Sequence, residues 1–188
     1  MDNDPKSRLL SADNTLLLIV DIQEKLLSAM ENPEKLIEKV SALIQGCTAL
    51  NIPIVVSEQV PHKLGPTAKE LLAHLPDETT TWAKTAFGCV QDANIQAHLS
   101  QLKRKQVILC GLETHVCVSQ TAHQLLSQGH QVHLITDACQ SRHKKDHKTG
   151  LSKMTQSGVI PSSVEMALFE MLASCEHAAF RQVQSLIK

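Results

Sequence analysis

The feature that most constrains this chain is the alternation of short apolar runs with longer amphipathic segments. A continuous run of about four to eight apolar residues is typical of a strand buried on both faces, as in a parallel sheet. Four such runs occur, at 15–23 (TLLLIVDIQ), 52–59 (IPIVVSEQ), 105–111 (KQVILCG) and 131–138 (QVHLITDA). Two weaker segments are also expected to be strands, at 78–84 (ETTTWAK) and 157–162 (SGVIPS).

The segments between these runs are predicted to be helices. Residues 32–50 carry Pro33 in the first turn and apolar side chains at helical spacing behind it. The same spacing starts at His115, and residues 162–187 form one or two further helices. Alternating strands and helices predict a single α/β domain over 1–188, with its core at about 10–175. We expect three layers, a mainly parallel, Rossmann-like six-stranded sheet with helices on both faces.

Composition excludes several classes of partner. The 188 residues suit one domain, and the net charge of −1 gives no case for binding nucleic acid or an acidic membrane. Aromatic residues are 2% of the chain with no tyrosine, which disfavours a base-stacking surface. We expect no membrane span and no secretory signal at residues 1–10. Six cysteines without a C-x-x-C pair then indicate reduced thiols and a cytoplasmic location.

Three reactive side chains lie at or just beyond the ends of predicted strands: Asp21, Lys84 and Cys117. Open α/β sheets build their sites at the carboxyl ends of strands, so these residues are candidates for one crevice. Each also has an ordinary structural interpretation. Asp21 is a good cap for a following helix, lysine is mostly solvated, and free cysteine is usually buried as a small hydrophobe.

The motifs around these residues resemble a known family. LLIVDIQ near the start, AKTAFGC in the middle and GLETHVCV after a strand occur in the order found in isochorismatase-like cysteine hydrolases. That family includes nicotinamidases and N-carbamoylsarcosine amidases. The resemblance covers about residues 10–175, and GLETHVCV is its most specific part. It implies a catalytic triad of Asp21, Lys84 and Cys117.

The residue types suit the implied chemistry. A thiol is mostly protonated at neutral pH, so a neighbouring carboxylate is needed to accept its proton. The thiolate of Cys117 attacks an amide-like carbonyl, Lys84 stabilises the anions, and Asp21 returns the proton to the leaving amine. By resemblance, backbone N–H groups of Glu113 and Cys117 form the oxyanion hole, and a cis peptide joins Leu112 to Glu113. Residues expected at the substrate pocket are Gln23, Trp82, Phe87 and Thr114.

Two departures from the family narrow the function. Nicotinamidases carry metal-binding histidines after the second strand, where this chain reads SEQVPHKLGP with only His62 nearby. The run RHKKDHK, with His143 and His147, is interpreted as a solvated charged segment. We therefore expect no metal and no cofactor, which disfavours nicotinamide as substrate. Members that cleave the vinyl ether of isochorismate typically lack the cysteine, which disfavours that reaction.

Three functions remain open. The favoured one is a metal-free hydrolase of a small-molecule amide or related C–N bond. The second is a vinyl-ether hydrolase with Asp21 as the acid, and the third is a non-catalytic binding or scaffold protein on the same fold.

Self-association is expected as well. By resemblance to relatives of this fold, we predict a homo-oligomer, a dimer or a multiple of one. An apolar stripe near the C-terminus either forms a seam between copies or packs on the sheet; it consists of Val164, Ala167, Leu168, Met171 and Leu172.

Overall fold

A computed structural model describes residues 8–188. Residues 1–7 lie outside the described residues, and with them most of the stretch for which we expected no secretory signal. The strands are β1 Thr15–Val20, β2 Ile54–Gln59, β3 Thr81–Lys84, β4 Gln106–Leu112, β5 Gln131–Gln140 and β6 Ile160–Ser162. The α-helices are α1 Glu24–Leu27, α2 Pro33–Ala49, α3 Pro61–Leu64, α4 Lys69–Leu72, α5 Ala93–Gln101, α6 Ser119–Ser127, α7 Lys144–Gln156, α8 Val164–Leu172 and α9 Phe180–Ser185. Three short turns of other helix types are η1 Ala12–Asn14, η2 Cys89–Gln91 and η3 Thr114–Val118.

The six strands form one sheet in the order β3-β2-β1-β4-β5-β6, and every pair is parallel. This arrangement confirms the predicted α/β class and the six-stranded parallel sheet. The predicted strands hold to within a few residues, although β5 runs two residues beyond its predicted end at Ala138. The direction of winding changes between β1 and β4, which is where open parallel sheets bind their ligands.

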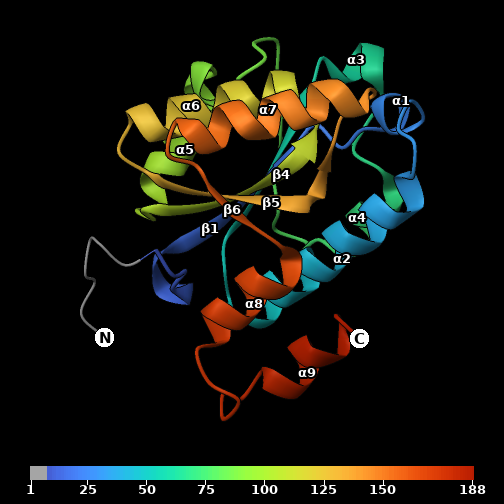
Figure 1. The fold of residues 1–188 in the computed structure, drawn as a ribbon. Helices are drawn as coiled ribbons and strands as arrows, with labels where there is room; N and C mark the ends of the chain where they lie inside the picture. The colour runs from blue at the N-terminus through green and yellow to red at the C-terminus, as the bar shows by residue number, and fades with distance from the viewer. Residues whose placement is uncertain (1–7) are drawn as a thin grey trace.

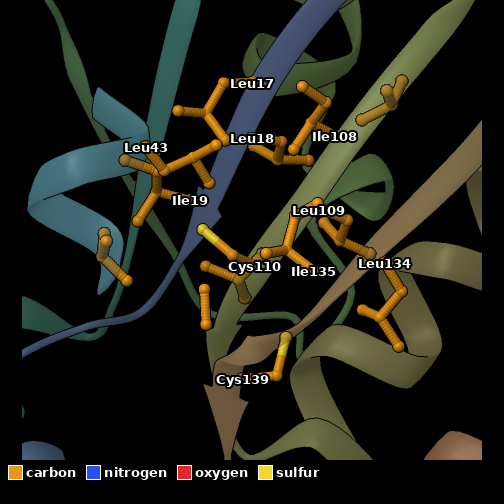
Figure 2. Packing of buried hydrophobic residues seen from close by; sticks show 14 of the residues in the cluster. Leu17, Leu18, Ile19, Leu43, Ile108, Leu109, Cys110, Leu134, Ile135 and Cys139 are labelled. Carbon is orange, nitrogen blue, oxygen red and sulfur yellow. The ribbon is translucent and has the colours of Figure 1, made fainter. Parts of the chain in front are cut away.

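Helices cover both faces of the sheet (Figure 1). On one face lie α5, α6 and α7; on the other, α2 packs with α4 and α8, and α9 lies against α2. Strands β1 and β4 are buried along their whole length. Figure 2 shows their leucine and isoleucine side chains packed with those of β5 and with Leu43 of α2. None of the helices described for residues 8–188 has both the length and the apolar character needed to cross a membrane.

The C-terminal segment forms two helices, and its apolar stripe faces inward. Val164, Ala167 and Leu168 are at most 1% exposed, and Met171 and Leu172 are buried too. Helix α8 packs these side chains on α2 and β5. The interpretation of the stripe as a seam between copies is therefore wrong, because the same side chains complete the core of one chain. Amphipathic spacing alone does not tell these two roles apart.

Gly111 of β4 supplies a first prediction. Its φ is +146°, and a Cβ there would overlap the carbonyl oxygen of Val20, its register partner in β1. Central strand backbone cannot yield without breaking the sheet, so Gly111→Ala is expected to lower the free energy of unfolding by about 3 kcal/mol or more. Urea denaturation measures the change. Gly129→Ala is the control, since Gly129 also has a positive φ, +81°, but no atom lies within 4 Å of an added Cβ. The cost of this substitution is expected near 1 kcal/mol. Equal losses would contradict the steric account.

Candidate active site

Asp21 follows directly on β1 and is fully buried, with a left-handed backbone at φ 53°. The parallel register places Val20 opposite Ser57 of β2, so Asp21, the residue after β1, lies beside the Ser57 side chain. Ser57 Oγ donates to Asp21 Oδ1 at 2.8 Å, and the Asp21 N–H donates to the Ser57 carbonyl at 3.1 Å. Asp21 is thus bound to β2 by one backbone hydrogen bond and one side-chain hydrogen bond.

Lys84 ends β3 and is only 2% exposed. Its Nζ donates to Asp21 Oδ2 at 2.7 Å and to Gln59 Oε1 at 2.6 Å. The carbonyl oxygens of Ala86 and Phe87 accept from the same ammonium at 3.2 and 3.0 Å. Two structural interpretations are therefore wrong. Lys84 is not solvated, and Asp21 is not a helix cap, because Gln23 occupies the N-cap position of α1.

Cys117 lies in η3, a π-helical turn between β4 and α6. Cys117 is 5% exposed, and its thiol lies close to the Asp21 carboxylate. Burial raises the pKa of the Cys117 thiol, the charge of Asp21 raises it further, and the Lys84 ammonium opposes both. The thiol is therefore neutral at rest, with a carboxylate in contact to receive its proton. The structure brings all three predicted triad residues together.

The loop that leads to Cys117 differs from the expectation at one bond. No peptide among residues 8–188 is cis, so the predicted cis bond between Leu112 and Glu113 is wrong. The chain turns instead at Glu113, which has a left-handed backbone (φ 56°, ψ 61°). Its buried carboxylate accepts from Arg142 Nε at 2.7 Å and lies 3.4 Å from His115 Nδ1. These contacts hold the residue in its uncommon conformation. The backbone N–H groups of Glu113 and Cys117 stay a predicted oxyanion hole.

Two of the four predicted pocket residues have their polar groups engaged inside the protein. Gln23 is fully buried; its amide donates to the carbonyls of Gln59 and Gly65, and its oxygen accepts from the Gln59 N–H. Thr114 is also buried, and its hydroxyl pairs with His147 Nδ1 at 2.9 Å. His147 is half-buried, and burial lowers its pKa. The interpretation of its segment as fully solvated is therefore wrong at this residue.

The two aromatic candidates differ in their surroundings. The Trp82 ring packs against the imidazole of His98 in α5, with ring centroids 5.1 Å apart. Phe87 is 54% exposed, although its carbonyl accepts from the buried Lys84 ammonium. Of the four predicted pocket residues, Phe87 is the one that joins the triad to the surface.

Sequence reasoning missed four polar side chains that complete the site: Ser57, Gln59, Cys89 and Thr121. Cys89 Sγ lies 3.3 Å from Ser57 Oγ, and the Cys89 N–H donates to Thr121 Oγ1 at 3.0 Å. Thr121 Oγ1 in turn donates to the Cys117 carbonyl at 2.7 Å. The available signal was the alternation of β2, which turns Ser57 and Gln59 to the same side of the strand.

No group of three histidine, cysteine, aspartate or glutamate side chains in residues 8–188 converges as a metal site. Ser57 and Gln59 hydrogen-bond the ion pair instead, and Glu58 accepts from the N–H and hydroxyl of Thr67, both at 2.7 Å. The residues at the end of the second strand thus bind the ion pair of Asp21 and Lys84 and a loop.

Comparison with known proteins gives consistent matches. Residues 15–166 match the family model described as the isochorismatase domain. Isochorismatase domain-containing protein 2 of Danio rerio is 35% identical over 179 residues, which is 95% of this chain and 89% of that protein.

Solved structures agree in fold. A structure described as MAR1 ribonuclease from Caenorhabditis elegans superposes with a TM-score of 0.91 at 34% identity, over 95% of this chain and 92% of that one. The Escherichia coli YCAC gene product, described as an octameric hydrolase of unknown specificity, has a TM-score of 0.88 at 23% identity, over 95% and 90% of the two chains.

The buried ion pair leads to a stability prediction. Lys84→Met leaves the Asp21 carboxylate buried without its cation, so the free energy of unfolding is expected to fall by about 3–5 kcal/mol. Adding Asp21→Asn should recover part of that loss, because the uncompensated charge disappears. Urea denaturation of the double-mutant cycle measures both effects.

The matched control is the exposed pair of Lys144 and Glu31, whose charged atoms are 2.8 Å apart. Lys144→Met should change stability by about 0.5 kcal/mol or less. Similar losses for the two lysines would show that the Lys84 pair has no special weight in the fold.

Proposed function

The chain belongs to the isochorismatase domain family, and we propose that it is a hydrolase in which Cys117 attacks a small amide or related C–N substrate. One observation carries the proposal: the Asp21 carboxylate contacts both the Cys117 thiol and the Lys84 ammonium in a buried cluster. The pattern supplies a nucleophile, a base within hydrogen-bond reach and a cation that orients the base.

The chemistry proceeds in two halves. Asp21 takes the thiol proton as Cys117 Sγ bonds to the substrate carbonyl carbon. The resulting oxyanion is stabilised by loop N–H groups, and Asp21 returns the proton to the leaving nitrogen as the C–N bond breaks. Water then attacks the thioester with Asp21 as base, which releases the acid and restores the thiol. Burial keeps the resting thiol neutral, so nucleophile and base are activated together rather than separately.

The alternatives make different demands on the same residues. A vinyl-ether hydrolase would need Asp21 as an acid and no nucleophile, which leaves the thiol contact of Asp21 without a role. A binding protein would need no base beside the thiol. RNA cleavage is a further candidate, because the C. elegans relative is described as a ribonuclease. The net charge of −1 gives little attraction to a phosphate backbone.

Three further features belong to the proposal. We infer that turnover needs no metal, that the protein works in the cytoplasm with its thiols reduced, and that copies associate into a closed oligomer. All six cysteines are unpaired in the structure. The E. coli neighbour is described as octameric, while the exposed apolar residues of α8 here are Met166 and Phe169, not the predicted stripe.

Replacement of the nucleophile tests the proposal. A panel of small carboxamides, carbamoyl compounds, hydroxamates and a single-stranded RNA is incubated with wild-type protein and with Cys117→Ala. We expect hydrolysis of at least one C–N substrate by the wild type, and a fall of about 10⁴-fold or more in the variant, which has no nucleophile.

Cys175→Ala is the matched control, since Cys175 is exposed and far from the triad in sequence. The hydrolytic activity of this variant should equal that of the wild type. Full activity of Cys117→Ala on a C–N substrate would overturn Cys117 as the nucleophile, and full activity on the RNA would favour the ribonuclease chemistry instead.

Metal removal gives an independent check. Dialysis against a strong chelator is expected to change neither the turnover of the panel substrate nor the melting temperature, because the ion pair is held by amide, hydroxyl and carbonyl groups. Activity that is lost with the chelator and restored by zinc or iron would overturn the metal-free mechanism.

A further inference from the structure

Ser57 has an unusual position in the buried cluster. Its side chain is fully buried and lies between two groups with exchangeable protons. Ser57 Oγ donates to Asp21 Oδ1 at 2.8 Å, and on its other side it accepts from Cys89 Sγ at 3.3 Å. A hydroxyl can donate and accept at the same time, so Ser57 links the carboxylate to a second thiol.

The two oxygens of Asp21 consequently have different partners. Oδ2 faces the Lys84 ammonium, which only donates and has Gln59 Oε1 and two carbonyl oxygens as its other acceptors. A proton on Oδ2 that pointed toward Lys84 would meet the N–H groups of the ammonium, which cannot accept it. Oδ1 faces Ser57, which reverses from donor to acceptor when its hydroxyl rotates. Of these two partners, Ser57 is the one that can accept a proton from the carboxylic acid, which favours the acid with its proton on Oδ1.

We propose that Ser57 is a positioning residue that directs the proton taken from Cys117 to Asp21 Oδ1, with Cys89 as the group that receives the rotated Ser57 hydroxyl. In this step the S–H bond of Cys117 breaks and an O–H bond forms on Oδ1. Ser57 Oγ then accepts from that O–H and turns its own hydrogen to Cys89 Sγ. When Ser57 donates to Cys89 Sγ, the Cys89 S–H turns to Thr121, which is also within hydrogen-bond reach. The inference rests on the proposed function, since it concerns the base of that reaction.

The titratable groups around Ser57 come from four segments. Asp21 follows β1, Lys84 ends β3, Cys89 begins η2 and Cys117 lies in η3. Lys84 contacts Oδ2 rather than Ser57, and burial raises the pKa of the Cys89 thiol, which stays neutral. The acid side of any pH profile of Cys117 reactivity therefore reports the pair of Asp21 and Cys117.

The test is the pH dependence of Cys117 alkylation by iodoacetamide, followed by mass spectrometry of the Cys117 peptide. Loss of a hydrogen bond to the carboxylate makes the anion less stable, so protonation reaches it at higher pH. In Ser57→Ala the midpoint of the acid limb should move up by about one to two pH units. Cys89→Ala removes the acceptor that the rotated Ser57 hydroxyl needs in the acid form. It should therefore move the midpoint down by about half a unit, because the lost hydrogen bond is between neutral groups.

Ser57→Thr keeps the hydroxyl and should restore the wild-type midpoint. Ser41→Ala, a buried serine of α2 outside the cluster, is the matched control and should leave the midpoint unchanged. If Ser57→Ala does not fold, Ser57→Thr and Cys89→Ala still decide the matter, since an unshifted Cys89→Ala profile overturns the relay.

The outcomes separate this inference from the proposed function. If wild-type Cys117 reacts no faster than the buried Cys47, the proposed nucleophile itself fails. If wild-type Cys117 is reactive but Ser57→Ala keeps the wild-type midpoint, the role of Ser57 is overturned and the proposed function stands.

Discussion

The candidate site depends on one buried ion pair, between the Lys84 ammonium and the Asp21 carboxylate. Removing two charges from water costs several kcal/mol for each, and the contact is favourable only if the remaining hydrogen-bond groups are also satisfied. Here the ammonium has four oxygen acceptors, and the carboxylate has a donor on each oxygen. The pair thereby ties β1 to β3 across the intervening strand β2 and fixes the Asp21 carboxylate beside the Cys117 thiol.

The sheet makes this arrangement possible. Parallel pairing sets Val20 opposite Ser57 and Gln59 opposite Lys84, so the ends of three strands deliver their side chains to one edge. The fourth neighbour, β4, contributes the loop with Cys117 on the other side of β1. The winding reverses between β1 and β4, the position at which open parallel sheets typically bind their ligands. The fold and the chemistry therefore share the same constraint, the register of the central strands.

The sequence predicts the parts of this structure that depend on local pattern. Uninterrupted apolar runs predicted the strands, and their ends made Asp21, Lys84 and Cys117 candidates for one crevice. The role of these three residues as a catalytic triad was implied by the resemblance to a family. The alternation of β2 places Ser57 and Gln59 on one side of the strand, but it does not predict the contacts of Ser57 or Cys89, which depend on the pairing register and on a turn distant in sequence.

The apolar stripe of α8 and the turn at Glu113 could not be predicted from local sequence, because both depend on contacts with distant parts of the chain. The stripe on α8 has the same spacing whether it packs on its own sheet or on another copy, and the structure places it in the core. The backbone at Glu113 was expected to turn through a cis bond. It turns through a left-handed residue held by Arg142 instead, a contact that spans 29 residues of sequence.

The central claim is that the Cys117 sulfur forms a covalent bond to the substrate carbonyl carbon. The most direct measurement is rapid-quench mass spectrometry during turnover of the fastest C–N substrate found. The account predicts a transient mass increase equal to the acyl group, located on the Cys117 peptide, which rises and decays at rates consistent with product formation. Steady product release with no adduct on Cys117 at any quench time, and an adduct absent even when water attack is slowed, would contradict it.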